Sequence, residues 1–159
     1  MTSGKIRTVR ELSGIIKAAQ GKKKVVVFTN GCFDILHIGH AAYLAEAKKQ
    51  GDILVIGVNS DSSVRRIKGP GRPIVNEDDR AGLLASLQSV DYVTIFGEDD
   101  PGALVKELNP DVIIKGGDWK EDEIIGGDYV KGRGGKVLTV PLLKGRSTTA
   151  LIDRIRAIK

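Results

Sequence analysis

Short aliphatic runs alternate with amphipathic segments along the chain, and this alternation restricts the possible folds more than any other feature. The aliphatic runs predict buried strands at residues 25–29, 53–58, 92–96, 112–114 and 137–140. Strands that alternate with helices are typical of βαβ units. We therefore predict an α/β fold, a Rossmann-like doubly wound parallel five-stranded sheet flanked by helices. The 159 residues suit a single domain (1–159), with residues 1–22 as an N-terminal helical extension.

Capping residues predict where several helices begin. Thr8 and Glu11 form a capping-box pattern, and the helix they start is expected to stop at Gly21. A second helix is expected from about residue 39 to residue 51. Further helix starts are predicted at Asp61, at Asn76, at Asp100-Pro101 as N-cap and first helical residue, and at Ser147.

Composition and charge exclude several classes of protein. Cys32 is the single cysteine, so no internal disulfide can form. There is no signal-peptide pattern and no apolar run of about 20 residues, which predicts a cytoplasmic protein without a membrane span. The net charge is +5, but no aromatic residues interleave with the basic clusters, so nucleic acid is not the expected partner. Phosphorylated small molecules account for the charge equally well.

Polar and glycine-rich segments follow the predicted strands. In a doubly wound sheet, ligands bind at the carboxyl ends of the strands, where the strand order reverses. The segments that follow strand ends are residues 30–31, 59–61, 116–118 and 144–149. We therefore expect the ligand crevice to be built from these segments.

The richest of these regions is the stretch of residues 29–40. Gly31 allows a tight turn after a buried strand, and Gly39 lets a ligand approach the backbone. His37 and His40 lie three residues apart at the start of a helix, so their rings are expected on one side. A helix N-terminus attracts anions, and two imidazoles there can donate hydrogen bonds to phosphate oxygens as charge builds during nucleotidyl transfer.

Two other interpretations of the histidines stay open at this point. His37 and His40 could bind zinc, although the only nearby partners would be Cys32 and Asp34. They could also be unrelated surface residues. They are, however, the only two histidines in the chain, and both fall in one four-residue window beside a glycine loop. The anion-binding interpretation is therefore preferred, with no metal held by the protein itself.

The pattern Gly31-x-Phe33-Asp34-x-x-His37-x-Gly39-His40 resembles the signature of the nucleotidyltransferase superfamily, which includes cytidylyltransferases and pantetheine-phosphate adenylyltransferase. The resemblance implies that His37 and His40 are catalytic and stabilise the transition state at the α-phosphorus. The later segment Arg146-Ser147-Thr148-Thr149 is similar to the family's second element, a hydroxyl-rich helix start that holds the triphosphate from the opposite side.

Further motifs resemble the adenylyltransferase domain of ADP-heptose synthases. They are residues 30–34, Lys68-Gly69-x-Gly71-Arg72-Pro73 and Lys115-Gly116-Gly117-Asp118-Trp119. The resemblance implies transfer of AMP from ATP, with Mg²⁺, to D-glycero-β-D-manno-heptose 1-phosphate for lipopolysaccharide core assembly. Many relatives carry a sugar kinase domain on the same chain; a chain of this length is expected to be the stand-alone form, served by a separate heptose-7-phosphate kinase.

The remaining site residues are assigned with this resemblance in view. The expected nucleotide contacts are Asn30, Gly31, Cys32, Phe33, Gly39, Gly116, Gly117, Asp118, Arg146, Ser147, Thr148 and Thr149. The expected contacts to the sugar phosphate or pyrophosphate are Asp34, Asp61, Lys68, Arg72, Arg80 and Lys115. Asp34 could instead cap the following turn, and each basic side chain could simply be solvated.

Three rival functions were weighed. The His-Ile-Gly-His string also resembles class I aminoacyl-tRNA synthetases, but the chain lacks their later lysine-rich loop and tRNA-binding domains. Glycerol-3-phosphate cytidylyltransferase is close in size and motif, and base choice rests on resemblance alone. A non-catalytic nucleotide sensor is a third possibility. The histidine pair and the hydroxyl-rich helix start are both intact, which counts against it. Relatives are commonly dimers or larger, so a homo-oligomer is expected.

Overall fold

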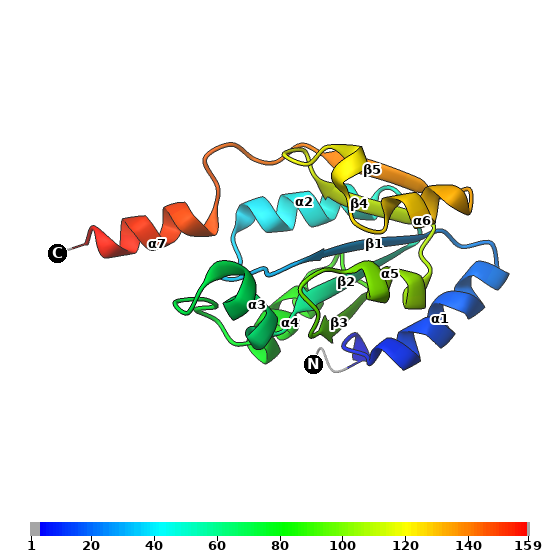
Figure 1. Ribbon diagram of the computed structural model, residues 1–159, viewed down its shortest axis with the longest axis horizontal. Helices are drawn as coiled ribbons and strands as arrows, with labels where there is room; N and C mark the ends of the chain where they lie inside the picture. Colours follow the sequence, from blue (N-terminus) through cyan, green and yellow to red (C-terminus); the bar gives the residue numbers. More distant parts are fainter. Residues whose placement is uncertain (1–3, 159) are drawn as a thin grey trace.

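The structure is a computed structural model that describes residues 4–158; residues 1–3 and 159 lie outside the described part. A five-stranded parallel sheet forms its centre, with the strand order β3-β2-β1-β4-β5 (Figure 1). The strands are β1 (Val26–Gly31), β2 (Ile53–Asn59), β3 (Tyr92–Phe96), β4 (Val112–Gly116) and β5 (Lys136–Val140). The order reverses between β1 and β4, because the chain runs outward from β1 to β3 and then returns to the other side of β1.

One face of the sheet is covered by α2 (Ile38–Lys48) and α4 (Glu77–Ser86). Leu44 of α2 and Leu84 of α4 pack in one buried cluster with Ile56 of β2. These three side chains are fully buried, so this layer fixes the position of α2, which carries the two histidines, against the sheet.

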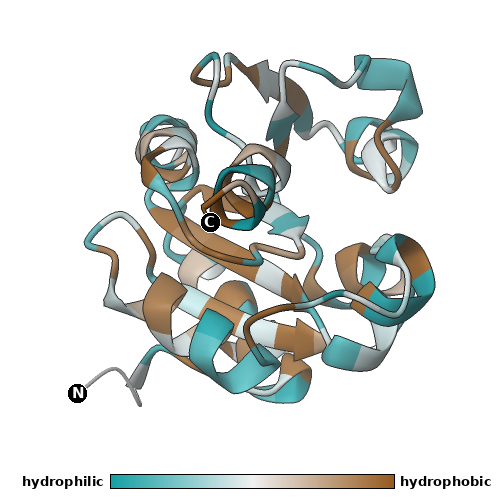
Figure 2. Ribbon diagram, turned by 90° about the vertical axis from the view of Figure 1, so that its left-hand side faces the viewer, coloured by the Kyte–Doolittle hydropathy of each residue, from teal (hydrophilic) through white to brown (hydrophobic). Residues whose placement is uncertain are grey.

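The opposite face is covered by α1 (Val9–Gly21), α5 (Gly102–Leu108) and α6 (Gly127–Gly132). Leu12 of α1 and Leu108 of α5 pack in a second buried cluster with Phe28 of β1. Successive residues of a strand point to opposite faces, which explains why both clusters draw on the same strands. Figure 2 shows hydrophobic colour concentrated along the strands and hydrophilic colour on the outer surfaces of the helices. The predicted N-terminal extension is thus an integral part of the packed domain.

Two helices lie close to the carboxyl edge of the sheet instead of covering a face. The first is α3 (Asp61–Lys68), which directly follows β2. The second is α7 (Thr148–Arg156), which has no buried residue and projects away from the body (Figure 1). A short 3₁₀ helix, η2 (Glu121–Glu123), precedes α6. None of the helices described between residues 4 and 158 has the length and apolar content that crossing a bilayer requires.

The predicted element order is confirmed, with a few displaced ends. Thr8 and Asn76 cap their helices as predicted. The helix at residue 61 is capped by Ser60 rather than Asp61, and the helix after residue 100 has Pro101 at the N-cap position without a side-chain cap bond. Two elements, η2 and α6, are not predicted from the sequence; α6 spans six residues, two of them glycine, and is too short to show helical periodicity.

Candidate active site

A cleft of about 680 Å³ opens at the carboxyl ends of β1, β2 and β4. It therefore lies beside the point where the strand order reverses, as expected for a doubly wound sheet. Predicted site residues that line the cleft are Asn30, Gly31, Cys32, Phe33, Asp34, His37, Gly39, His40, Lys68, Arg72, Lys115, Gly116, Asp118, Arg146, Ser147, Thr148 and Thr149. The structure thus brings the two histidines and the hydroxyl-rich helix start into one cavity.

The loop between β1 and α2 has an unusual backbone. Phe33 and Ile35 have φ values of 48° and 51°, in the left-handed region that non-glycine residues seldom adopt. Such conformations persist only where the surroundings impose them, and they concentrate at functional sites. Gly31, just before them, leaves room for the Phe33 ring, because a Cβ there would come within a tight 3.2 Å of it.

Asp34 is the anchor that imposes this loop conformation. Its carboxylate is 1% exposed and accepts hydrogen bonds from the backbone N–H groups of Ile74 (2.9 Å) and Val75 (2.9 Å). It also accepts a hydrogen bond from Nε of Arg72 at 2.5 Å. Burial by itself would raise the pKa of Asp34, but these donors outweigh burial, and the pKa is lowered. Asp34 thus stays ionised and ties the β1–α2 loop to the loop before α4.

His37 and His40 stand at the first turn of α2 with their rings stacked, the centroids 3.9 Å apart. Nδ1 of His37 accepts a hydrogen bond from the N–H of Gly39 (3.1 Å), which makes His37 the N-cap. Nδ1 of His40 accepts from the N–H of His37 at 3.4 Å. In a neutral imidazole, an accepting Nδ1 leaves the proton on Nε2. Each ring therefore has an Nε2–H donor that these backbone bonds do not use.

The pKa of His40 is lowered to about 4, first by burial and then by the charge of His37. The pKa of His37 is also lowered, first by burial and then by the charge of Arg146. Both imidazoles are therefore neutral at pH 7 in the free protein. They act there as dipolar hydrogen-bond donors, and a bound polyphosphate would favour their protonation.

The lowered pKa of His40 predicts how stability depends on pH. In the unfolded chain this histidine titrates near its ordinary value of about 6.5. Between about pH 6.5 and 4 the unfolded state thus binds more protons, and the free energy of unfolding should fall as the pH falls through this window. In urea unfolding at several pH values, His40→Gln should show a shallower fall than the wild type. Parallel curves for the two proteins would contradict the lowered pKa.

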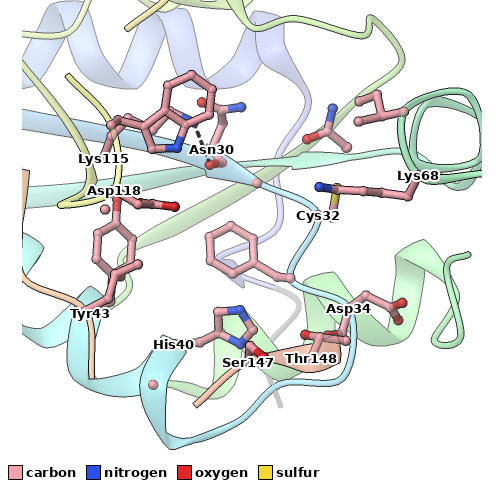
Figure 3. A pocket seen from close by; sticks show the side chains of 18 of the residues that line it. Asn30, Cys32, Asp34, His40, Tyr43, Lys68, Lys115, Asp118, Ser147 and Thr148 are labelled. Atoms are coloured by element: carbon pink, nitrogen blue, oxygen red, sulfur yellow. Dashed lines mark hydrogen bonds between the residues drawn. The ribbon is translucent and has the colours of Figure 1, made fainter. Parts of the chain in front are cut away.

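The start of α7 is held against the β1–α2 loop. The hydroxyl of Thr148 donates a hydrogen bond to the backbone oxygen of Asp34 at 2.6 Å. Ser147 is the N-cap of α7, as predicted, and accepts from the N–H of Ala150. Figure 3 shows Ser147 and Thr148 close to His40 and Asp34. Two helix N-termini, those of α2 and α7, therefore border the same cleft.

Gly39 lines the cleft and also meets a packing requirement. A Cβ at this position would lie 2.9 Å from the ring of His37 and 3.1 Å from Cβ of Arg146. These two side chains occupy the space that a side chain at residue 39 would need. Gly39 permits the close approach of α2 and the segment before α7.

Lys115 connects the ends of β4 and β1 on the opposite side of the cleft. Its ammonium group donates a hydrogen bond to the backbone oxygen of Asn30 (3.0 Å; Figure 3) and lies 5.6 Å from the ring centroid of Trp119. Burial lowers the pKa of Lys115 to about 8, against opposing contributions from Cys32 and Asp118. Oδ1 of Asn30 is buried without a hydrogen-bond partner. This side of the cleft combines a cation, a flat aromatic ring and exposed backbone.

Arg80 and Asp61 do not line the cleft, contrary to expectation. Arg80 is 1% exposed and donates to the backbone oxygens of Val75 (2.9 Å) and Cys32 (2.5 Å) and to the carboxylate of Asp61 (2.7 Å). The guanidinium therefore bonds to protein oxygens, because α4 directs it inward beneath the β1–α2 loop. Both residues support the loop: each side-chain nitrogen of Arg80 donates to a protein oxygen, and Asp61 supplies one of these oxygens.

Arg80→Met should therefore act on stability. Removing one partner of a buried ion pair leaves an uncompensated group, which typically costs about 3 kcal/mol or more. We expect the free energy of unfolding, measured with urea at pH 7, to fall by about this amount. If Arg80→Met kept the wild-type stability but bound phosphate more weakly, Arg80 would instead be a phosphate-binding residue.

Gly117 is also outside the cleft lining; its N–H donates to the backbone oxygen of Val140. Conversely, several lining residues were not assigned as contacts, namely Tyr43, Asn59, Ile67, Asp99, Asp100, Pro101, Trp119, Ile125, Leu142 and Leu143. Asn59 belongs to the segment 59–61, which was expected at the crevice because it follows a predicted strand. The others lie on helices or loops whose position relative to the strand ends depends on tertiary packing.

The side chains of residues 4–158 include no group of three histidine, cysteine or acidic residues that could hold a metal ion. The zinc interpretation of His37 and His40 thus has no ligand set within the described chain. Asp34, its nearest acidic partner, is already occupied by Arg72, Ile74 and Val75.

Comparison with known proteins agrees with this geometry. Residues 28–151 match the family described as cytidylyltransferase-like. The chain belongs to the cytidylyltransferase-like family. A solved structure, the lipopolysaccharide core biosynthesis protein from Thermoplasma volcanium GSS1, is 38% identical, with a TM-score of 0.62 over 77% of this chain and 99% of that one.

Curated relatives in the same family are more similar still. The bifunctional protein HldE of Geobacter metallireducens is 50% identical, and the match covers 97% of this chain and 31% of that protein. HldE of Magnetococcus marinus is 52% identical, and the match covers 89% of this chain and 28% of that protein. The chain thus spans about a third of the length of these relatives. Pantoate-beta-alanine ligase from Francisella tularensis shares the fold, with a TM-score of 0.66 at 15% identity over 91% of this chain and 69% of that one.

Proposed function

We propose that this domain is an adenylyltransferase that moves AMP from ATP to a heptose 1-phosphate and releases pyrophosphate. One observation carries the nucleotidyl-transfer part of this proposal. His37, His40, Ser147 and Thr148 line a single cleft at the switch point of the sheet. The ADP-heptose assignment is supported by the motifs at residues 30–34, 68–73 and 115–119, and by the relatives named HldE.

The proposed chemistry is an in-line displacement. An oxygen of the sugar phosphate forms a new bond to the α-phosphorus of ATP, and the bond from this phosphorus to the bridging oxygen of pyrophosphate breaks. The attacking phosphate oxygen is already anionic at neutral pH, so the reaction needs no general base. Catalysis then depends on positioning and on stabilisation of the negative charge that builds around the phosphorus.

The two imidazoles and the two helix N-termini would supply this stabilisation. The Nε2–H groups of His37 and His40 are fixed before the substrate arrives, because Nδ1 of each ring is held by a backbone N–H. Donors that need no reorganisation during the reaction are the most effective. The α7 start would hold the β- and γ-phosphates from the other side through Ser147, Thr148 and Thr149.

Mg²⁺ is expected to bind with ATP rather than to the protein alone. It prefers oxygen ligands and usually keeps several waters while contacting substrate phosphates. The lack of a three-residue ligand group in the described chain fits this mode. When bound, Mg²⁺ would neutralise part of the triphosphate charge.

A cytidylyltransferase of the glycerol-3-phosphate type is the second candidate, and the family description favours it. The two candidates differ in the base and in the acceptor. Pyrophosphate release should therefore be measured with ATP and with CTP, each against heptose 1-phosphate, other sugar 1-phosphates and glycerol 3-phosphate. We expect release only with ATP and heptose 1-phosphate. Preference for CTP and glycerol 3-phosphate would establish the second candidate, and nucleotide binding without release would indicate a sensor.

The remaining parts of the proposal follow from this reaction. A heptose kinase would supply the acceptor, and we place the enzyme in the cytoplasm, as the sequence predicts. The homo-oligomer predicted from the sequence stays a prediction, which sedimentation equilibrium can test.

A further inference from the structure

Asn59, the last residue of β2, lines the cleft and carries an amide oxygen that accepts no hydrogen bond within residues 4–158. The residue is 3% exposed, and its Nδ2 donates to the hydroxyl of Ser63 at 3.0 Å and to the backbone oxygen of Glu98 at 3.4 Å. These two bonds fix the orientation of the amide. Oδ1 accepts no hydrogen bond from any residue that the structure describes, yet it is not sealed off from solvent. Since Asn59 lines the cleft, this oxygen is available to a ligand.

The chemistry of an amide oxygen restricts what can bind there. It accepts hydrogen bonds and cannot donate them, so it does not suit a phosphate oxygen, which is also an acceptor at neutral pH. It requires a ligand hydroxyl or N–H group. A ligand that donates to this oxygen gains a hydrogen bond, whereas a ligand without a donor at that position displaces solvent from the oxygen and leaves it unpaired.

The position of Asn59 indicates which ligand meets it. β2 lies on the far side of β1 from β4, whose end carries Gly116, one of the expected nucleotide contacts. The neighbours of Asn59 along the cleft combine apolar side chains with charged ones, namely Ile67, Lys68, Asp99, Asp100 and Pro101. Apolar patches beside carboxylates and a cation are suited to a polyhydroxylated ring that carries a phosphate.

We infer that Asn59 is a specificity residue that recognises one hydroxyl group of the sugar acceptor through its Oδ1. This inference rests on the proposed function and extends it, because it assigns the β2 side of the cleft to the sugar. Asn59 is held in place by Ser63 and Glu98 before the sugar binds. It would therefore discriminate against acceptors that lack the hydroxyl group it contacts.

The first test needs no variant. kcat and KM should be measured for the wild-type protein with heptose 1-phosphate and with a series of its monodeoxy analogues. An analogue that lacks the recognised hydroxyl should show kcat/KM lower by roughly 3- to 10-fold, the range of a single neutral hydrogen bond.

The second test compares two variants over the same series. Asn59→Ala removes the acceptor oxygen, so the penalty for the critical analogue should disappear, while the penalties for the other analogues and the KM for ATP stay unchanged. Ser62→Ala is the matched control: it removes a hydroxyl from an exposed position of the same helix that contacts Ser60 rather than Asn59, and Ser62 does not line the cleft. It should keep the wild-type discrimination.

The outcomes separate this inference from the proposed function. The protein could release pyrophosphate with the sugar phosphate while Asn59→Ala changes the kcat/KM ratio of no deoxy analogue to the full sugar. This result would overturn the inference about Asn59 and leave the proposed function intact. A raised KM for ATP in Asn59→Ala, with sugar discrimination intact, would also overturn it and place the oxygen against the nucleotide. Absence of release with every acceptor would instead reject the proposed function. If Asn59→Ala fails to fold, equal kcat/KM values across the wild-type deoxy series overturn the inference without it.

Discussion

Replacing His37 with Ala is expected to lower kcat for pyrophosphate release by roughly 10²- to 10³-fold, the effect of losing one preorganised donor to a developing anion. His40→Ala should have an effect of similar size. The KM for ATP should change much less, because the donors act mainly on charge that appears in the transition state. The double variant should lose less than the sum of the two free energies, since both rings act on the same group. Single-turnover measurements with saturating ATP test these values.

His37 also caps α2, so its structural role must be separated from its chemical one. Asn is a good N-cap residue, whereas Ala costs about 1 kcal/mol of stability at such a position. His37→Asn should therefore regain the stability lost in His37→Ala while staying as inactive. If His37→Asn regained both the stability and the activity, His37 would matter only as the N-cap of α2. His40→Gln, whose amide nitrogen can reach the position of Nε2, should keep more activity than His40→Ala.

Asp34→Ala is expected to lower the free energy of unfolding by about 3 kcal/mol or more at pH 7. The substitution leaves the Arg72 guanidinium and the N–H groups of Ile74 and Val75 without their shared acceptor in a buried place. Activity should fall as well, because the Asp34 carboxylate holds the loop that leads to His37 and that also presents the backbone oxygen bonded by the Thr148 hydroxyl. Urea unfolding and pyrophosphate release, measured on the same preparation, test both effects.

The pH dependence of this effect has a definite sign. The lowered pKa of Asp34 contributes stability at pH values above the ordinary carboxyl range, and that contribution is lost as the pH falls through the lowered pKa. The stability gap between wild type and Asp34→Ala should therefore shrink in acid. Glu46→Ala is the matched control, because Glu46 pairs with Lys49 where both side chains are at least half exposed. It should change stability by less than about 1 kcal/mol; an equal loss in both variants would show that burial of Asp34 is irrelevant.

The fold was largely predictable because its signals are local. The buried strands appear as aliphatic runs, and Thr8, Asn76 and Ser147 cap their helices through bonds to residues three positions away. Errors occurred where two neighbouring residues could both cap, as with Ser60 and Asp61. The backbone conformation decides between such candidates, and the sequence does not show it.

The site was predictable where a strand end or a helix start determines it. His37, His40 and Ser147 belong to this group, and the switch-point rule placed them in one cleft. Arg80 was misassigned because a cation near a glycine loop looks the same whether it faces solvent or is buried beneath the loop. Asn59 lies in the segment 59–61 that was expected at the crevice, but the sequence does not show which of its side chains faces the cleft. Which side chain remains unpaired depends on contacts such as Asn59 to Ser63, which exist only in the folded chain.

The central claim is that one pocket, bordered by two imidazoles and two helix starts, holds the triphosphate. A crystal structure of the protein with Mg²⁺ and α,β-methylene-ATP tests it most directly, because this analogue cannot release pyrophosphate. We predict that the α-phosphate lies within hydrogen-bond distance of Nε2 of His37 and His40 and that the terminal phosphates contact the backbone N–H groups at Ser147 to Thr149. A triphosphate bound away from both histidines, or from the start of α7, would contradict the account.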